Sequence, residues 1–354
     1  MRLVLQRRLF LRALTAAIAT LPGMPALASD ATSASRSIKL PSGAEMPLVG
    51  LGTWESPPGA VTGAVKAALD AGCRHIDCAP VYRNEAEVGD ALASSGVPRS
   101  ELFLTSKLWN DRRRPDDVRD ALDQTLRDLQ TDYVDLYLIH WPVVWQKNSV
   151  MKPDHAASIR EAWQTLEALV DEGKCRHIGV SNFKQSELDE LLSYARIPPA
   201  VQQIELHPRL PQVELVQYCQ ARGIAVTAYS PLGRGDVKKA GLLSSPVVQR
   251  IADDKGVSPA AVLLRWNVQR GVAVIPKSAN PTRVRQNVQQ PWGFRLNPAE
   301  VVALDALADG SRFCTAPWST FDDRTMSDKL LTSVLTGAAS AIFSVASLDV
   351  TAMR

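Results

Sequence analysis

The 354-residue sequence lacks the features that mark several protein classes. It has no apolar run of about 18 residues, the minimum for a membrane-spanning helix. Aromatic residues make up only 6% of the chain, and the net charge is only +3, from 40 basic and 37 acidic side chains. Such a weak overall field does not attract nucleic acid or an acidic membrane. The composition therefore predicts no membrane span and no nucleic-acid partner, and it favours a small-molecule site.

Metal and disulfide motifs are also missing. The five cysteines are an odd number and include no C-x-x-C pair, so the sequence predicts neither a zinc site nor a complete set of disulfides. No two histidines have metal-ligand spacing with a carboxylate, and we therefore expect no metal. We expect buried free thiols at Cys73, Cys78, Cys175, Cys219 and Cys314.

Residues 1–28 have the order of a targeting segment. Arginines without any acid come first, then a largely apolar stretch of nine residues at 13–21, a Pro-Gly break and a small-x-small cleavage site ending at Ala28. Arg7-Arg8-Leu9-Phe10-Leu11 resembles a twin-arginine export signal, which predicts an exported, periplasmic protein. The alternative is a transit peptide for a plastid or mitochondrion. Removal of the segment and its four arginines would change the net charge from +3 to −1.

From residue 37 onward, short apolar runs alternate with helical patterns. A hairpin is predicted over residues 37–46, closed by a Pro-x-Gly turn. Between the eight predicted strands, apolar residues recur with helical spacing. Eight strand–helix pairs over about 280 residues predict an α/β fold, a (β/α)8 TIM barrel with an N-terminal hairpin cap. The strands are expected at residues 48–51, 74–77, 102–107, 134–140, 177–180, 201–204, 225–229 and 272–275.

A doubly wound dinucleotide-binding sheet is the alternative architecture. That fold requires a G-x-G-x-x-G turn after its first strand. The segment GLGTWE at residues 50–55 lacks the third glycine. The sequence therefore favours the barrel over the doubly wound sheet.

Titratable side chains close three consecutive predicted strands. Asp77 ends the second strand, Lys107 the third and His140 the fourth, while Tyr82 follows Asp77 by five residues. In a barrel these positions meet at one end, where chemistry is usually located. An ammonium beside a phenol stabilises the phenolate and lowers the phenol pKa, so we expect Tyr82 to act as a general acid toward a carbonyl oxygen. Nothing in the set supplies a hydride, which must therefore come from a cofactor.

Five ordered motifs resemble the aldo-keto reductase family, of the aldose and aldehyde reductase type. They are GCRHIDCAPVYRNE at 72–85, LTSKLW at 104–109, DLYLIHWP at 135–142, IGVSNF at 178–183 and IPKS at 275–278. The similarity covers residues 37–318, which are expected to form one barrel domain. Residues 319–354 form an extension outside it.

The resemblance implies NADPH-dependent reduction of aldehydes, ketones or sugars by a monomer, with Asp77, Tyr82, Lys107 and His140 as the catalytic residues. Lysine and arginine near the adenosine 2′-phosphate favour NADP(H) over NAD. The implied cofactor contacts are Gly52, Thr53, Trp54, Ser181, Asn182, Gln203, Tyr229, Ser230, Leu232, Arg234, Lys277, Ser278, Asn280, Arg283, Gln286 and Asn287. The expected substrate pocket consists of Trp54, Tyr82, His140 and Trp141.

Two questions stay open at the level of sequence. A barrel that binds NADPH without turnover, as a redox sensor or regulatory subunit, is the alternative function. Substrate choice is expected to depend on three loops, at residues 141–157, 233–243 and 309–323.

The arginines at 112–114, which precede Pro115, predict a solvated helix start.

Overall fold

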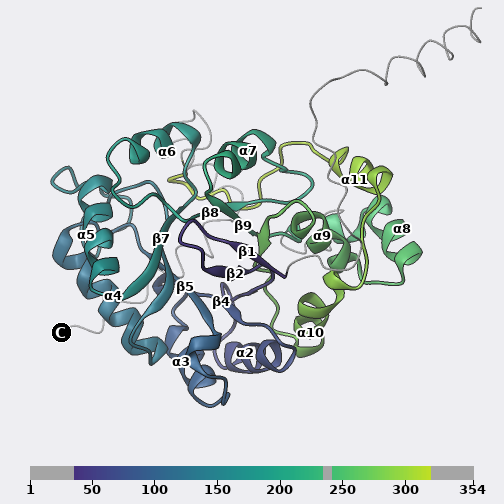
Figure 1. Ribbon diagram of the computed structural model, residues 1–354, viewed down its shortest axis with the longest axis horizontal. Helices are drawn as coiled ribbons and strands as arrows, with labels where there is room; N and C mark the ends of the chain where they lie inside the picture. Colours follow the sequence, from purple (N-terminus) through teal and green to yellow (C-terminus); the bar gives the residue numbers. More distant parts are fainter. Residues whose placement is uncertain (1–35, 234–240, 320–354) are drawn as a thin grey trace, which may run out of the picture. The chain divides into compact units, whose positions relative to one another are not determined.

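The computed structural model of the protein describes residues 36–233 and 241–319 (Figure 1). The predicted targeting segment at 1–28, the predicted cofactor contact Arg234 and all but the first residue of the predicted extension at 319–354 lie outside this part. Within the described ranges, no helix has both the length and the apolar composition needed to cross a membrane.

Eight parallel strands follow one another around the sheet in chain order. A parallel bridge between Val49 and Val274 closes the circle, because the Gly50 N–H donates to the Val274 carbonyl at 2.8 Å and the Val274 N–H donates to the Leu48 carbonyl at 2.8 Å. The closure confirms the predicted barrel. The strands are β3 (Leu51–Gly52), β4 (His75–Asp77), β5 (Phe103–Leu108), β6 (Val134–Ile139), β7 (Cys175–Ser181), β8 (Val201–Glu205), β9 (Ala225–Tyr229) and β10 (Ala273–Val274).

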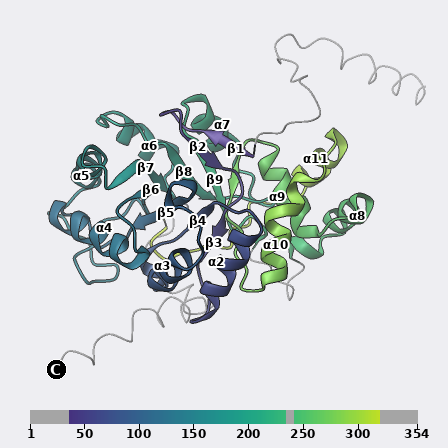
Figure 2. The same cartoon turned by 60° about the horizontal axis from the view of Figure 1, so that its bottom comes forward.

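Helices cover the outside of the strands. In both views α4 and α5 lie on one side of the strands, and α8, α9 and α10 lie on the other (Figures 1 and 2). Gly72, Gly173 and Gly223 follow three of the helices with positive φ, as expected for helix ends. The helices are α2 (Ala60–Asp70), α3 (Glu85–Ala93), α4 (Pro115–Leu129), α5 (Ile159–Asp171), α6 (Gln185–Leu192), α7 (Val213–Ala221), α8 (Pro246–Lys255), α9 (Pro259–Val268), α10 (Pro281–Gln289) and α11 (Pro298–Asp305).

The strands are buried on both faces, since side chains fill the inside of the barrel and helices cover the outside. All six residues of β5 and all six of β6 are buried. This explains why the strands appear in the sequence as nearly continuous apolar runs. The polar residues within them, Lys107 above all, are exceptions that require a buried partner.

The predicted hairpin covers the end of the barrel where the strands begin. Strands β1 (Ser37–Lys39) and β2 (Glu45–Pro47) pair antiparallel and lie in front of the barrel strands in Figure 1. Met46, in the middle of β2, is fully buried. Two side chains fasten the hairpin to the barrel, since His75 Nδ1 lies 3.3 Å from the Pro47 carbonyl and His177 Nε2 lies 2.7 Å from Ser42 Oγ.

Gly52 lies beside the seam that closes the barrel. Its N–H donates to the Pro276 carbonyl at 3.2 Å. A Cβ at this position would lie 2.7 Å from the carbonyl oxygen of Ile275, closer than van der Waals contact allows. Glycine is therefore required by the close approach of two backbones.

We predict opposite effects for two glycine-to-alanine substitutions. G52A should lower the free energy of unfolding by about 1–3 kcal/mol, because the added methyl group forces the seam apart. Gly63 is an exposed position of helix α2 with open space around an added Cβ, so G63A should raise stability by about 0.5–1 kcal/mol. Denaturant unfolding of both variants measures the effects. A G52A variant as stable as wild type would show that the seam tolerates a side chain.

Candidate active site

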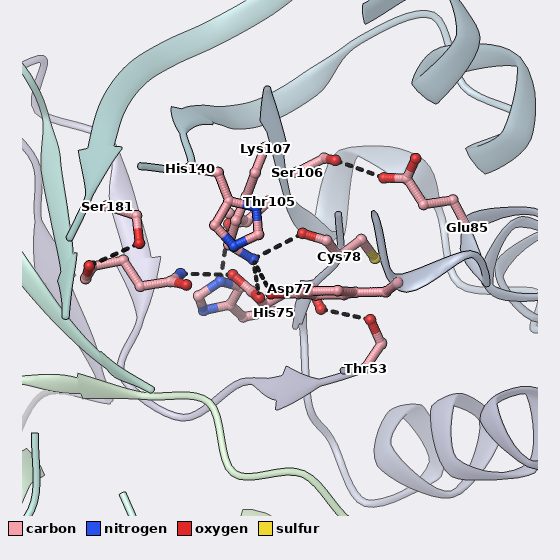
Figure 3. Close-up of polar contacts among 12 residues, drawn as sticks. Thr53, His75, Asp77, Cys78, Glu85, Thr105, Ser106, Lys107, His140 and Ser181 are labelled. Carbon is pink, nitrogen blue, oxygen red and sulfur yellow. Dashed lines mark hydrogen bonds and ion pairs between the residues drawn. The ribbon is translucent and has the colours of Figure 1, made fainter. Parts of the chain in front are cut away.

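The barrel brings the four predicted side chains together at the carboxyl ends of its strands. Asp77 ends β4, Lys107 lies near the end of β5 and His140 follows β6. Tyr82 ends the short 3-10 helix η1 (Pro80–Tyr82) that follows β4. Asp77, Lys107 and His140 are buried. Figure 3 shows that Lys107, Asp77 and His140 point toward one another.

The Lys107 ammonium is the centre of the cluster. It donates to Asp77 Oδ1 at 2.5 Å, to the Cys78 carbonyl at 2.8 Å and to Tyr82 Oη at 3.2 Å, so its three N–H groups have three acceptors. Burial alone would lower the pKa of this amine, but the combined charge and hydrogen-bond effects of Asp77 and Tyr82 outweigh burial and raise the pKa above its usual value. Lys107 is therefore a permanent cation inside the barrel.

Tyr82 is a neutral phenol next to this cation. Burial raises the pKa of Tyr82 to about 12, and the nearby Lys107 lowers it by less than burial raises it. The sequence predicts a net lowering of this pKa, and that prediction is wrong because burial has the larger effect. The hydroxyl therefore keeps its proton near neutrality and has an ammonium at 3.2 Å to stabilise the phenolate after proton loss.

His140 is a neutral imidazole. Burial and the charges of Lys107 and Arg113 hold its pKa well below its usual value. Its ring lies edge-on to Tyr82, with 5.9 Å between centroids, and Nδ1 has no hydrogen-bond partner among the described residues. A neutral imidazole beside a phenol can donate one hydrogen bond to a bound oxygen atom.

Four of the predicted cofactor residues form a hydrogen-bonded row beside the cluster. Gln203 Nε2 donates to Asp77 Oδ2 at 2.7 Å, and Ser181 Oγ donates to the Gln203 carbonyl at 2.9 Å. Asn182 Nδ2 donates to the His140 carbonyl at 2.9 Å, while Asn182 Oδ1 accepts from Tyr229 Oη at 2.7 Å. The row therefore joins three further strands, β7, β8 and β9, to the buried ion pair.

Predicted cofactor residues from the first barrel strand have mixed positions. Thr53 is buried, and its Oγ1 donates to the Asp77 carbonyl at 2.9 Å, so it supports the cluster. Gly52 lies at the seam described above. Trp54 is 37% exposed and lies outside the buried aromatic groups.

Two further predicted cofactor residues, Ser230 and Leu232, follow β9 and are partly buried. Ser230 has a positive φ of 48°.

A second group of predicted cofactor residues surrounds the start of α10. Asn280 Oδ1 accepts from the Arg283 N–H at 3.1 Å and so caps the helix, while Ser278 Oγ accepts from the Asn280 N–H at 3.1 Å. Lys277 Nζ donates to the Glu55 carbonyl at 2.8 Å. Asn287 is buried and Gln286 is partly buried.

The group around α10 has the chemistry of a phosphate site. Burial and repulsion from Arg283 lower the pKa of Lys277, against the opposing charge of Glu55. A bound phosphate dianion would relieve that repulsion, and the helix N-terminus adds its own positive potential. The donor set therefore fits the 2′-phosphate of NADP(H).

Comparison with known proteins decides the family. The model of the aldo/keto reductase family matches residues 48–309, which include all four clustered side chains. The chain belongs to the aldo/keto reductase family. This confirms the resemblance of the five motifs. The protein is an oxidoreductase of a family that generally uses NADP(H).

The relatives of this aldo-keto reductase match it along most of their length. It is 48% identical over 306 residues to mouse aldo-keto reductase family 1 member A1, a match covering 81% of this chain and 94% of the mouse protein. It is 50% identical over 268 residues to an aldo/keto reductase of Synechocystis, covering 71% and 82%. The solved structure of Schistosoma japonicum aldose reductase is 40% identical with a TM-score of 0.75, covering 82% of this chain and 97% of that one.

The comparisons contradict the predicted destination of this aldo-keto reductase. The relatives found at these identities are cytosolic aldo-keto reductases. The prediction of an exported protein, or of a plastid or mitochondrial one, is therefore wrong.

Four tryptophans form an aromatic wall in this aldo-keto reductase, beside His140. The Trp109 ring lies 5.0 Å from His140 and 5.9 Å from Trp145, and Trp318 lies 5.0 Å from Trp145 and 6.1 Å from Trp141. Trp141 was predicted for the pocket, whereas Trp109 and Trp145 were missed. Trp109 carried a usable signal, since it follows the Lys107 strand by one residue.

Glu205, at the end of β8, fastens the segment that carries Trp318. Its carboxylate is fully buried and accepts from the backbone N–H groups of Phe313 at 2.6 Å and Cys314 at 3.0 Å. His207 Nε2 lies 3.0 Å from the same carboxylate. Sequence reasoning missed this role, because the contacts join residues about 108 positions apart. The carboxylate thereby positions one of the three loops expected to select the substrate.

Glu85, at the start of α3, is a buried carboxyl group behind the cluster. Ser106 Oγ donates to its Oε1 at 2.5 Å and Thr125 Oγ1 donates to its Oε2 at 3.1 Å. Burial nevertheless raises the pKa of Glu85 to about 7, against the effect of these two hydrogen bonds. Glu85 is therefore a buried carboxyl group that titrates close to neutrality.

The raised pKa of Glu85 predicts a pH-dependent stability. Between the unfolded pKa of about 4.3 and about 7, the folded chain binds more protons at Glu85, so the free energy of unfolding falls as pH rises through this window. The E85Q variant removes this term. As pH rises from 5 to 8, the free energy of unfolding of E85Q should fall by about 2–3 kcal/mol less than that of wild type. Denaturant unfolding across this range measures the difference, and parallel pH profiles would contradict the assignment.

Proposed function

We propose that the protein reduces aldehydes, ketones or sugars to alcohols with NADPH, and that Tyr82 is the general acid. The observation that supports this most is the Tyr82 hydroxyl 3.2 Å from the Lys107 ammonium, on a ring that lies edge-on to His140. A carbonyl oxygen at this point would meet one proton donor and one hydrogen-bond donor. The hydrogen bonds from both groups are stronger to an alkoxide oxygen than to a carbonyl oxygen.

The proton moves along a short path. Tyr82 transfers its proton to the oxygen as the alkoxide forms, and the resulting phenolate is stabilised by Lys107 at 3.2 Å. Asp77 keeps Lys107 in place from the other side, at 2.5 Å. Because His140 is neutral, it donates a hydrogen bond without competing for the proton. NADPH, when bound, supplies the hydride, so that carbonyl, hydride and one proton give the alcohol and NADP+.

The cofactor contacts follow the two groups described above. Ser181, Asn182 and Gln203 would hold the nicotinamide carboxamide, with the ring on Tyr229. Ser230, Leu232 and Arg234 would lie along the pyrophosphate, with Gly52, Thr53 and Trp54 as further contacts. Lys277, Ser278 and Arg283 would bind the 2′-phosphate, and Asn280, Gln286 and Asn287 would line the adenine. The paired cations Lys277 and Arg283 support NADPH over NADH.

The substrate would contact Tyr82 and His140 at its carbonyl end and Trp141 and Trp54 beyond it. The buried part of this surface consists mainly of indole rings, which favour an apolar or aromatic aldehyde. Residues 37–318 would form the complete reductase domain.

The Y82F variant tests the proposal. Wild type should oxidise NADPH in the presence of aldehydes, with less activity toward NADH, and Y82F should lose about 10²–10⁴-fold in kcat because the general acid is gone. The assay follows the decrease in NADPH absorbance over a panel of aldehydes, ketones and sugars. The matched control is Y133F, at a tyrosine that packs against Arg99 and Arg176 away from the cluster. Tight NADPH binding without any turnover in wild type would instead favour a redox sensor or regulatory subunit.

A further inference from the structure

Arg113 is buried, against the expectation of a solvated run at residues 112–114. Helix α4 begins at Pro115 as expected, and the side chains of Arg112 and Arg114 are 31% and 53% exposed. Arg113, between them, is only 1% exposed. A long cationic side chain is rarely this buried, because leaving water costs several kcal/mol unless polar groups replace it.

The guanidinium is compensated by backbone carbonyl groups. It donates to the carbonyls of Leu108 at 3.1 Å, Trp109 at 2.8 Å, Trp141 at 2.9 Å and Val143 at 3.3 Å. Within residues 36–233 and 241–319, no carboxylate oxygen forms an ion pair with it. Burial lowers the pKa of Arg113 to about 9, against the charge of Asp111, so the group stays cationic near neutrality.

The four carbonyls belong to two different loops. Leu108 and Trp109 lie where β5 passes into the loop before α4, whereas Trp141 and Val143 lie in the loop after β6. Arg113 is therefore a fork that joins the two loops through their main chains. A lysine could not do the same, because its ammonium has three donors on one atom and no planar fork.

The joined loops carry the aromatic wall and hold His140. Trp109 and Trp141 supply acceptors for Arg113 and are themselves two of the four tryptophans. His140 lies between the two loops, its N–H donates to the Leu108 carbonyl at 3.2 Å, and its ring contacts Trp109 edge-on. The orientation of the wall toward a bound carbonyl compound thus depends on contacts that pass through Arg113.

We propose that Arg113 is a positioning residue that fixes the aromatic wall, through the Trp109 and Trp141 main chains, at the distance from His140 that an aromatic substrate needs. The proposal rests on the proposed carbonyl reductase function. The planar Arg113 guanidinium sets the separation of the two loops. No other described side chain hydrogen-bonds to both the Trp109 and the Trp141 carbonyl. Arg113 therefore affects which substrates bind well without touching the substrate.

Four variants test the proposal on the full-length protein. R113M removes the charge and the fork, and R113K keeps the charge but removes the fork. R112M and R114M are matched controls in the same run, where Arg112 bonds Asn148 and Arg114 pairs with Asp154 at the surface. For each, KM and kcat are measured with benzaldehyde and with propanal, and the tryptophan signal is recorded by near-ultraviolet circular dichroism without substrate.

Both Arg113 variants should raise KM for benzaldehyde about tenfold relative to propanal, with a smaller change in kcat, because the wall shifts while Tyr82 and Lys107 stay in place. Both should weaken the near-ultraviolet signal, and both controls should match wild type. If R113M fails to fold, R113K decides alone, since it keeps the buried charge paired with carbonyls. A folded R113K with the wild-type KM ratio and the wild-type spectrum would overturn the proposal. The spectrum decides the wall geometry even if the chain reduces no carbonyl compound, so the two failures are distinguishable.

Discussion

The buried ion pair of Lys107 and Asp77 is the interaction on which the rest of the site depends. At 2.5 Å, with a second hydrogen bond from Lys107 to the Cys78 carbonyl, it keeps a full positive charge inside a barrel of apolar strands. Removing one partner of such a pair typically costs about 3–5 kcal/mol, because an uncompensated charge remains buried. Gln203 satisfies the second oxygen of Asp77 at 2.7 Å, so the strand opposite in the barrel also depends on this pair.

Two kinds of group surround that pair, and they act on different parts of a carbonyl compound. Half-buried Tyr82 and buried His140 are polar and neutral, and they would face the oxygen atom. The four tryptophans are apolar and would face the remainder of the molecule. Buried charged side chains position these groups through hydrogen bonds. Lys107 contacts the Tyr82 phenol, Arg113 contacts the two loops that carry Trp109 and Trp141, and Glu205 contacts the segment that carries Trp318. Low local dielectric makes each of these contacts stronger than it would be in water.

The sequence predicted the barrel and the four clustered side chains because both depend on local signals. Strands buried on both faces give apolar runs, and residues that close parallel strands meet at one end of the barrel. It could not show the neutral state of Tyr82, since that depends on burial by distant segments, nor the Glu205 contacts across more than 100 residues. The burial of Arg113 was missed because a run of three arginines before a helix is usually solvated, and its four acceptors are backbone atoms without a sequence signature.

The most direct test of this account is a measurement of the protonation state of Tyr82. Tyrosine labelled with ¹³C at Cζ gives one resonance per residue, and comparison with Y82F assigns the Tyr82 signal. With a pKa of about 12, the signal should stay at the phenol position from pH 6 to pH 10 in wild type. A phenolate signal at or below pH 7 would contradict the account, because Tyr82 would then have lost, near neutrality, the proton that it is proposed to donate.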